Sequence, residues 1–198
     1  MISGNFIDPI SESSTNLSKL IVCLTGMPGA GKSTIANGLK EKGFEIINMG
    51  DAVRAEAEKR NLEPTSQNLG KLMLELREKN GPGAVAELIK PSIENSNSNV
   101  IVIDGIRSND EIKVLKKSAN VKLLSILAST NTRFTFLHDR GRSDDPKSRE
   151  IFEERDNREL NVGVGKSIES ADESISNNKL TKDELIEAAY QVIQSWKE

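Results

Sequence analysis

The segment KLIVCLTGMPGAGKST, residues Lys19 to Thr34, joins an apolar run to a glycine-rich loop and decides the fold. The run from Lys19 to Thr25 has the apolar, β-branched composition of a buried strand, and the stretch from Lys32 to Lys42 is compatible with a helix. Between them stands Gly26 to Ser33, which fits the pattern G-x-x-x-x-G-K-[ST]. A strand, a glycine-rich loop and a helix in this order predict a P-loop in an α/β protein.

The residue types of this loop suit the shape and charge of a polyphosphate. Glycines let backbone N–H groups point inward at the β-phosphate, and the N-terminus of the following helix adds a favourable dipole. The Lys32 ammonium would bridge the β- and γ-phosphates, and the Ser33 hydroxyl would bind Mg²⁺. We therefore predict ATP and Mg²⁺ as cofactors. The predicted nucleotide-binding residues are Gly26, Met27, Pro28, Gly29, Ala30, Gly31, Lys32, Ser33 and Thr34.

Asp104 is the second predicted magnesium-binding residue, beside Ser33. It ends the apolar run VIVID, residues 100–104, where an acid that holds the metal directly or through water is expected in a P-loop protein. The alternative is an ordinary acid at a strand end that caps the next turn. The P-loop upstream favours the metal-binding interpretation.

Composition limits the class of protein. A chain of 198 residues suits one compact domain, which we expect over residues 19–198. The net charge of -3 arises from 27 basic and 30 acidic residues mixed along the chain, so we expect neither general nucleic-acid binding nor membrane binding. A single cysteine excludes an intramolecular disulfide framework. Residues 1–18 lack the features of a secretory signal and are expected to form a flexible tail on a cytoplasmic protein.

The rest of the chain alternates between strand and helix patterns. Phe44 to Asn48 is the second predicted strand, and residues 51–97 contain helical periodicity without a strand candidate. Val100 to Asp104 and Val121 to Ala128 are the third and fourth strands, and a weak fifth strand is expected near Ser174 to Ser176. This alternation predicts a parallel sheet with a helical insertion after its second strand.

A polar break from Gly141 to Pro146 interrupts a charged, helical stretch and predicts a mobile flap. Asp144 and Asp145 are expected to cap a helix that Pro146 opens. Near the C-terminus, Thr181 and Glu184 have the spacing of a capping box, which predicts the start of the last helix.

Three segments resemble the adenylate-kinase and nucleoside-monophosphate-kinase family, and the similarity runs from about Lys19 to the C-terminus. Gly50 to Arg54 (GDAVR) resembles the G-D-x-[LV]-R box, and Asp104 to Arg107 (DGIR) is similar to D-G-F-P-R without its proline. Gly141 to Asp145 (GRSDD), followed by Glu150 and Arg155, resembles the lid segment G-R-x-D-D-(x)-E-(x)-R, with two extra residues before the last arginine. In finer detail the chain resembles the uncharacterised archaeal group of adenylate-kinase-related P-loop proteins.

The resemblance implies a three-layer α/β P-loop NTPase fold with a five-stranded parallel sheet in the order 2-3-1-4-5. It implies that residues 51–97 form an acceptor-binding helical insertion and that a short lid lies at residues 140–158. It also implies that Asp51, Arg54 and Arg107 bind the acceptor, with both arginines on its phosphate.

Arginines on the flap are the remaining catalytic candidates, together with Lys32. Phosphoryl transfer requires cations around the equatorial oxygens and the exclusion of water, and arginines on a closing flap supply both. Arg142 and Arg155 are the first choices, followed by Arg140 and Arg158. The alternative for each is a solvated charge paired with a glutamate at helical spacing.

The position of Asp51 leaves two kinds of acceptor open. The adjacent Arg54 favours a phosphate acceptor, which is already ionised and needs no base. An alcohol acceptor, as in dephospho-coenzyme A or shikimate kinases, would instead use the Asp51 carboxylate as an orienting group or base. A third alternative is an ATP-binding or ATP-hydrolysing regulatory or assembly protein. We expect a kinase that moves the γ-phosphoryl group of Mg-ATP to a small phosphorylated acceptor, in particular a nucleoside monophosphate.

Overall fold

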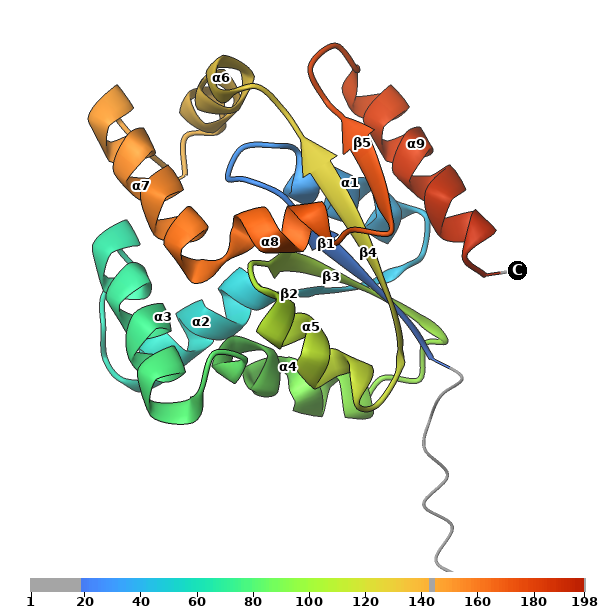
Figure 1. Cartoon of the computed structure of the whole chain (residues 1–198), viewed down its shortest axis with the longest axis horizontal. Coiled ribbons are helices and arrows are strands. Elements are labelled where there is room, and N and C mark those ends of the chain that lie inside the picture. Colours follow the sequence, from blue (N-terminus) through green and yellow to red (C-terminus); the bar gives the residue numbers. More distant parts are fainter. Residues whose placement is uncertain (1–18, 143–144, 198) are drawn as a thin grey trace, which may run out of the picture.

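Five parallel strands form a single sheet at the centre of the molecule (Figure 1). The computed structural model describes residues 19–142 and 145–197, so the tail expected at residues 1–18 lies outside the described residues. The strand order β2-β3-β1-β4-β5 and the parallel pairing confirm the predicted sheet. The strands are β1 (Leu20–Thr25), β2 (Glu45–Asn48), β3 (Val100–Ile106), β4 (Asn120–Leu127) and β5 (Glu173–Ser176).

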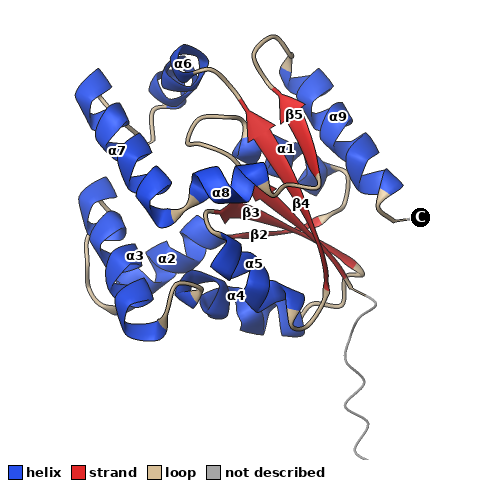
Figure 2. Cartoon of the chain, viewed as in Figure 1, coloured by secondary structure: helices blue, strands red, loops and turns tan. Residues whose placement is uncertain are grey.

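Helices cover both faces of this sheet and give the three layers that the family resemblance implied (Figure 2). Among the described residues, no helix is long and apolar enough to cross a membrane. The first helices are α1 (Lys32–Glu41), α2 (Met49–Lys59), α3 (Ser66–Asn80), α4 (Ala84–Glu94) and α5 (Asn109–Lys116). The others are α6 (Thr130–Arg140), α7 (Arg149–Val162), α8 (Val164–Glu169) and α9 (Lys182–Ser195).

The central strand β1 shows how the core is built. Ile21 and Cys23 pack into the cluster that includes α2 to α5, while Val22 and Leu24 pack into the cluster that includes α1 and α9. All four side chains are fully buried. Full burial of an aliphatic side chain of this size stabilises a fold by about 1.5–3 kcal/mol. An uninterrupted apolar run is therefore the pattern that a strand covered on both faces requires.

Capping boxes set the starts of two helices, α5 and α9. Thr181 and Glu184 form the predicted capping box at the start of α9, each bonding to the backbone N–H of the other. Ser108 and Glu111 form a second capping box at the start of α5. Each cap satisfies N–H groups that the helix leaves without a partner.

The carboxyl ends of the strands meet at one edge because all five strands are parallel. Ligands of open α/β sheets bind outside this edge. A segment of the candidate site follows each strand at this edge. The P-loop follows β1, the Gly50–Arg54 segment follows β2, Arg107 follows β3, α6 follows β4, and Asn177 follows β5.

Candidate functional site

Two neighbouring segments approach the P-loop so closely that Gly29 and Gly31 have no room for a side chain. Gly29 has φ +81°, and a Cβ there would lie 2.5 Å from the carbonyl oxygen of Arg133 in α6. Gly31 has φ +112°, and its Cβ would lie 2.5 Å from the side-chain nitrogen of Asn177. The same Asn177 nitrogen donates to the carbonyl oxygen of Ala30 at 2.9 Å. Because only glycine tolerates both the positive φ and the close approach, the neighbouring elements fix the shape of the loop.

The side chain of Lys32 turns back over the loop. Its ammonium donates to the carbonyl oxygens of Gly26 at 2.6 Å and Met27 at 3.1 Å. Burial lowers the pKa of Lys32 to about 8, although the nearby Asp104 carboxylate acts in the opposite direction. A bound polyphosphate would supply further negative charge and would therefore raise this pKa again.

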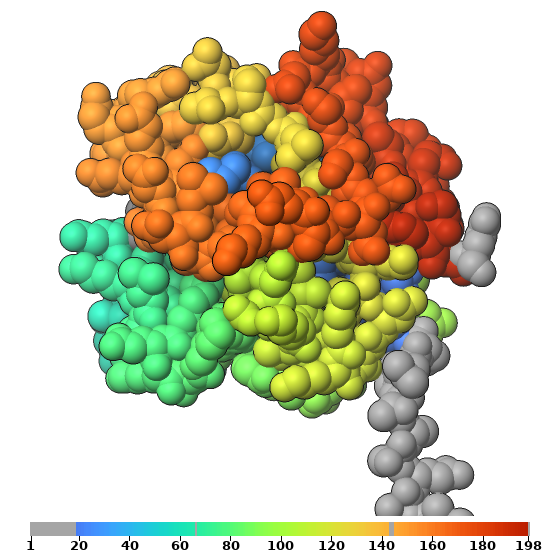
Figure 3. All heavy atoms as spheres, viewed as in Figure 1, coloured from blue at the N-terminus to red at the C-terminus, as the bar shows by residue number. Residues whose placement is uncertain are grey.

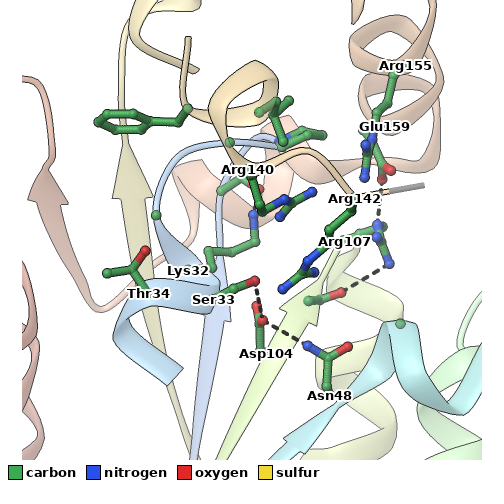
Figure 4. A pocket seen from close by; sticks show the side chains of 18 of the residues that line it. Lys32, Ser33, Thr34, Asn48, Asp104, Arg107, Arg140, Arg142, Arg155 and Glu159 are labelled. Carbon is green, nitrogen blue, oxygen red and sulfur yellow. Dashed lines mark hydrogen bonds and ion pairs between the residues drawn. The ribbon is translucent and has the colours of Figure 1, made fainter. Parts of the chain in front are cut away.

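Ser33 and Asp104, the two predicted magnesium-binding residues, are in contact. The Ser33 hydroxyl donates to Asp104 Oδ2 at 3.1 Å, and the Asn48 amide donates to the same oxygen at 2.9 Å (Figure 4). Within the described residues no group of three or more His, Cys, Asp and Glu could hold a metal. A hydroxyl and a single carboxylate nevertheless fit Mg²⁺, which prefers oxygen ligands and takes several of them from water and substrate phosphates.

A cavity of about 530 Å³ opens over the P-loop. In Figure 3, blue atoms from the first part of the described chain are visible in a hollow between the yellow and orange segments. Basic side chains outnumber acidic ones along the wall of this cavity, as an anionic ligand would require. The basic side chains are Lys32, Arg54, Arg107, Arg140, Arg142, Arg155, Arg158 and Lys182, and the acidic ones are Asp104, Asp139 and Glu159.

The predicted acceptor-binding residues lie on the β2 and β3 side of the site. Arg54 and Arg107 both line the cavity. Asp51 is exposed, pairs with Arg54 Nη1 at 2.7 Å, and lines an adjoining polar cavity of about 480 Å³. The Asp51 carboxylate is therefore engaged with the arginine that was expected to hold the acceptor phosphate.

The flap arginines enter the cavity from the opposite side. Arg140, Arg142 and Arg155 all line the cavity, and Figure 4 shows the first two near Lys32 and Ser33, with Arg155 beside Glu159. Asp145 connects them: it pairs with the Arg140 guanidinium, accepts from the Arg142 backbone N–H at 2.8 Å, and lies 3.7 Å from Arg155. Burial raises the pKa of Asp145, but the hydrogen bonds from Arg140 and Arg142 outweigh it, so the pKa lies below its usual range.

The prediction that Asp145 caps a helix opened by Pro146 is wrong. Helix α7 begins three residues later, at Arg149, and its cap is the Ser148 side chain, which accepts from the N–H of Ile151. The arginines that surround Asp145 offer it stronger, charge-assisted hydrogen bonds than a helix end does. Its partner in the same prediction, Asp144, lies outside the described residues.

Glu159, in the last turn of α7, is a residue of the site that the sequence did not reveal. Its side chain is 3% exposed in the folded chain, and its Oε2 lies 2.6 Å from Arg107 Nε. Burial raises the pKa of Glu159, but Arg107, Arg155, Arg158 and Lys32 together outweigh it and hold this pKa below its usual range. The carboxylate is therefore an internal counter-ion for the cations that line the cavity.

Comparison with known proteins shows a family. A family described as an AAA domain matches residues 25–153. A UPF0200 protein of Pyrococcus abyssi is 42% identical over 164 residues, which cover 80% of this chain and 88% of the relative. A UPF0200 protein of Methanopyrus kandleri is 39% identical over 181 residues, which cover 89% of this chain and 90% of the relative.

Solved structures share the fold at low sequence identity. A Thermus thermophilus protein superposes with a TM-score of 0.69 at 16% identity, over 91% of this chain and 98% of that one. Shikimate kinase from Acinetobacter baumannii, in complex with shikimate, superposes with a TM-score of 0.55 at 18% identity, over 92% of this chain and 96% of that one. The fold is therefore a kinase-like P-loop fold.

Binding of Mg-ADP is expected to weaken about tenfold between about pH 7 and about pH 9. Unliganded Lys32, with a pKa of about 8, is charged below that pH and loses its proton above it, whereas the bound phosphates need the ammonium. Isothermal titration calorimetry across this range measures the effect. In Lys32→Ala, binding should be weak and independent of pH, and a flat profile in the unmodified chain would contradict the assignment.

The variant Glu159→Gln is expected to lower the free energy of unfolding by about 3 kcal/mol near neutral pH, since it removes the anionic partner of a buried pair. The folded pKa of Glu159 lies below its ordinary value of 4.5. The charge contribution is therefore complete above about pH 4.5 and disappears as the pH falls through the folded pKa. Urea unfolding from about pH 7 to about pH 3 measures both effects.

The matched control for this experiment is Glu154→Gln, because Glu154 is exposed on the same helix. Its free energy of unfolding should remain within about 0.5 kcal/mol of the unmodified chain. A destabilisation by Glu159→Gln that keeps its full size at low pH would show that the charge of Glu159 is irrelevant.

Proposed function

The chain belongs to the UPF0200 family of P-loop proteins with an AAA domain, and from its site we propose that it is an ATP-dependent phosphotransferase. It moves the γ-phosphoryl group of Mg-ATP to a small phosphorylated acceptor, in particular a nucleoside monophosphate. One observation carries the proposal: arginines from three separate segments meet the P-loop in a single cavity. They come from α2 (Arg54), from the residue after β3 (Arg107), and from the proposed lid at residues 140–158 (Arg140, Arg142, Arg155 and Arg158).

Each side of the P-loop has a role in this proposal. Loop N–H groups and Lys32 bind the phosphates of ATP. Mg²⁺, held by Ser33 and Asp104, would neutralise charge on the phosphate oxygens. Arg142 and Arg155 stabilise the charge of the transferring phosphoryl group and take the place of water around it. A receptor that only senses ATP would have no need for so many arginines on this side of the nucleotide.

Apolar side chains at two places in the cavity support two nucleotides rather than one. Phe136 and Leu180 line it near α6 and α9, where they offer a surface for the base of ATP. Val53, Leu69 and Met73 line it between α2 and α3, beside Arg54, and offer a second apolar surface for the acceptor. Flat bases bind against apolar walls of this kind, while the arginines hold the phosphates.

The contacts of Asp51 favour a phosphate acceptor over an alcohol. A carboxylate that removes a proton from a hydroxyl must reach that hydroxyl within hydrogen-bond distance. Asp51 instead pairs with Arg54 and lines the adjoining cavity. In this proposal Asp51 orients Arg54 toward the acceptor phosphate, which is already ionised and needs no base.

A panel of acceptors tests the proposed reaction. With Mg-ATP, at least one nucleoside monophosphate should produce ADP faster than ATP alone, and the phosphorylated acceptor should be detectable by chromatography. Shikimate and phosphorylated alcohols belong in the same panel, because transfer to a hydroxyl would favour the alcohol-kinase alternative. ADP release at one rate with every compound would identify an ATPase and contradict the proposal.

Two substitutions distinguish the site that binds ATP from the site that binds the acceptor. Lys32→Ala should reduce turnover about 100-fold or more, since it removes a charge that the transition state needs. Arg54→Ala should raise the KM of the acceptor about tenfold or more while sparing ATP binding, because a charged hydrogen bond to phosphate is lost. Arg60→Ala is the matched control: Arg60 lies at the end of the same helix, α2, paired with Glu56 and Glu75. Equal loss of ATP affinity in Arg54→Ala would contradict its assignment.

A further inference from the structure

Arg133 is a buried arginine of α6 that neither the sequence motifs nor the proposed reaction use. Its guanidinium makes a bidentate ion pair with Asp156 of α7, in which Nη1 donates to Oδ1 at 2.8 Å and Nη2 donates to Oδ2 at 2.5 Å. The same Nη1 donates to the carbonyl oxygen of Pro28 in the P-loop at 3.1 Å. One guanidinium thus joins the phosphate-binding loop to the helix that follows the flap.

The packing around Arg133 is tight on both sides. The P-loop approaches the backbone of α6 so closely that Gly29 has no room for a Cβ beside the Arg133 carbonyl. On the other side, the Arg133 guanidinium lies over the ring of Phe152 in α7, 5.0 Å from its centroid, and Phe152 is fully buried. These contacts fix the position of α6 against the loop. Through its own contacts with α7, the Arg133 side chain also fixes the position of α7 relative to α6.

Helix α7 depends on such polar contacts because its apolar anchor is small. The buried residues of this helix are Phe152 and Glu159. A single phenylalanine holds a helix to the core but does not define its rotation or its axial position. The two-pronged geometry of an arginine–carboxylate pair defines both, and Asp156 directly follows Arg155, which lines the cavity.

We propose that Arg133 is a positioning residue, which acts through Asp156 to place the Arg155 guanidinium over the P-loop for phosphoryl transfer. The inference rests on the proposed function in one respect, the role of Arg155 in transfer. Lysine at position 133 would keep the charge and lose the planar fork, so it would hold Asp156 less exactly. Because transfer is sensitive to displacements of about 1 Å, the loss should be large in the transition state and small in nucleotide binding.

The test compares affinity for Mg-ADP with affinity for Mg-ADP plus aluminium fluoride, a planar mimic of the transferring phosphoryl group. In the unmodified chain, the fluoride should tighten nucleotide binding, and Arg155→Ala should remove most of this gain. Arg133→Lys should reduce the gain about tenfold while affinity for Mg-ADP alone stays within about twofold. The double variant Arg133→Lys/Arg155→Ala should lose no more than Arg155→Ala alone, because both changes act on the same contact.

Two further variants separate positioning from a loss of folding. Arg133→Met/Asp156→Leu replaces the buried pair by apolar groups, which is often tolerated in stability, and should still lose the gain. Arg149→Met is the matched control, since Arg149 also lies over the Phe152 ring, at 5.8 Å, yet pairs with Glu153 instead of Asp156. This control should keep the full gain.

The outcomes are distinct. Three results would overturn the positioning role. In the first, aluminium fluoride would tighten Mg-ADP binding as much in Arg133→Lys as in the unmodified chain. In the second, it would not tighten binding in the unmodified chain at all. In the third, the double variant would lose more of this tightening than Arg155→Ala alone. A chain that shows the gain, loses it in Arg133→Lys, and transfers to no member of the acceptor panel would contradict the kinase proposal while supporting the role of Arg133.

Discussion

The contact of the P-loop with two neighbouring segments is the constraint on which the rest of the site depends. Gly29 lies against the backbone of α6, and Gly31 lies against Asn177 after β5. These contacts place the loop between the segments that follow strands β4 and β5, on one side of β1 in the sheet. The loop is thus shaped by tertiary packing as well as by its own sequence, and its N–H groups are arranged before any phosphate arrives. Such preorganisation lowers the cost of binding an anion.

Charge balance is the second principle of the site. A cavity that gathers arginines from several elements must hold them close together in the absence of substrate, and their mutual repulsion opposes folding. Buried carboxylates reduce this repulsion: Glu159 faces Arg107, and Asp145 faces Arg140 and Arg155. The acids thereby keep the arginines at the cavity, at the cost of competing with an incoming phosphate for the same guanidinium groups.

The sequence predicted the elements whose signals are local. The strand–loop–helix pattern around Lys32, the parallel alternation and the capping box of Thr181 with Glu184 depend on neighbouring residues, and the structure has them. The order of the strands came from the family resemblance. The assignment of Asp145 to a helix cap failed because its carboxylate is held by Arg140, Arg142 and Arg155, the last of which lies ten positions further along the chain. Arg133, Asn177 and Glu159 were missed for the same reason: each acts across a long stretch of sequence, and nothing next to it in the chain marks it.

Asn48 carries a consequence for how this family can vary. Its amide oxygen caps α2 by accepting from the N–H of Asp51 at 3.1 Å, while its amide nitrogen donates to Asp104. Serine or threonine has one oxygen for both tasks, and aspartate would bring a second negative charge against Asp104 with no N–H to donate. Position 48 should therefore tolerate few replacements during evolutionary drift. A chain with another residue there would have to change both the hydrogen bonding of Asp104 and the N-terminal cap of α2.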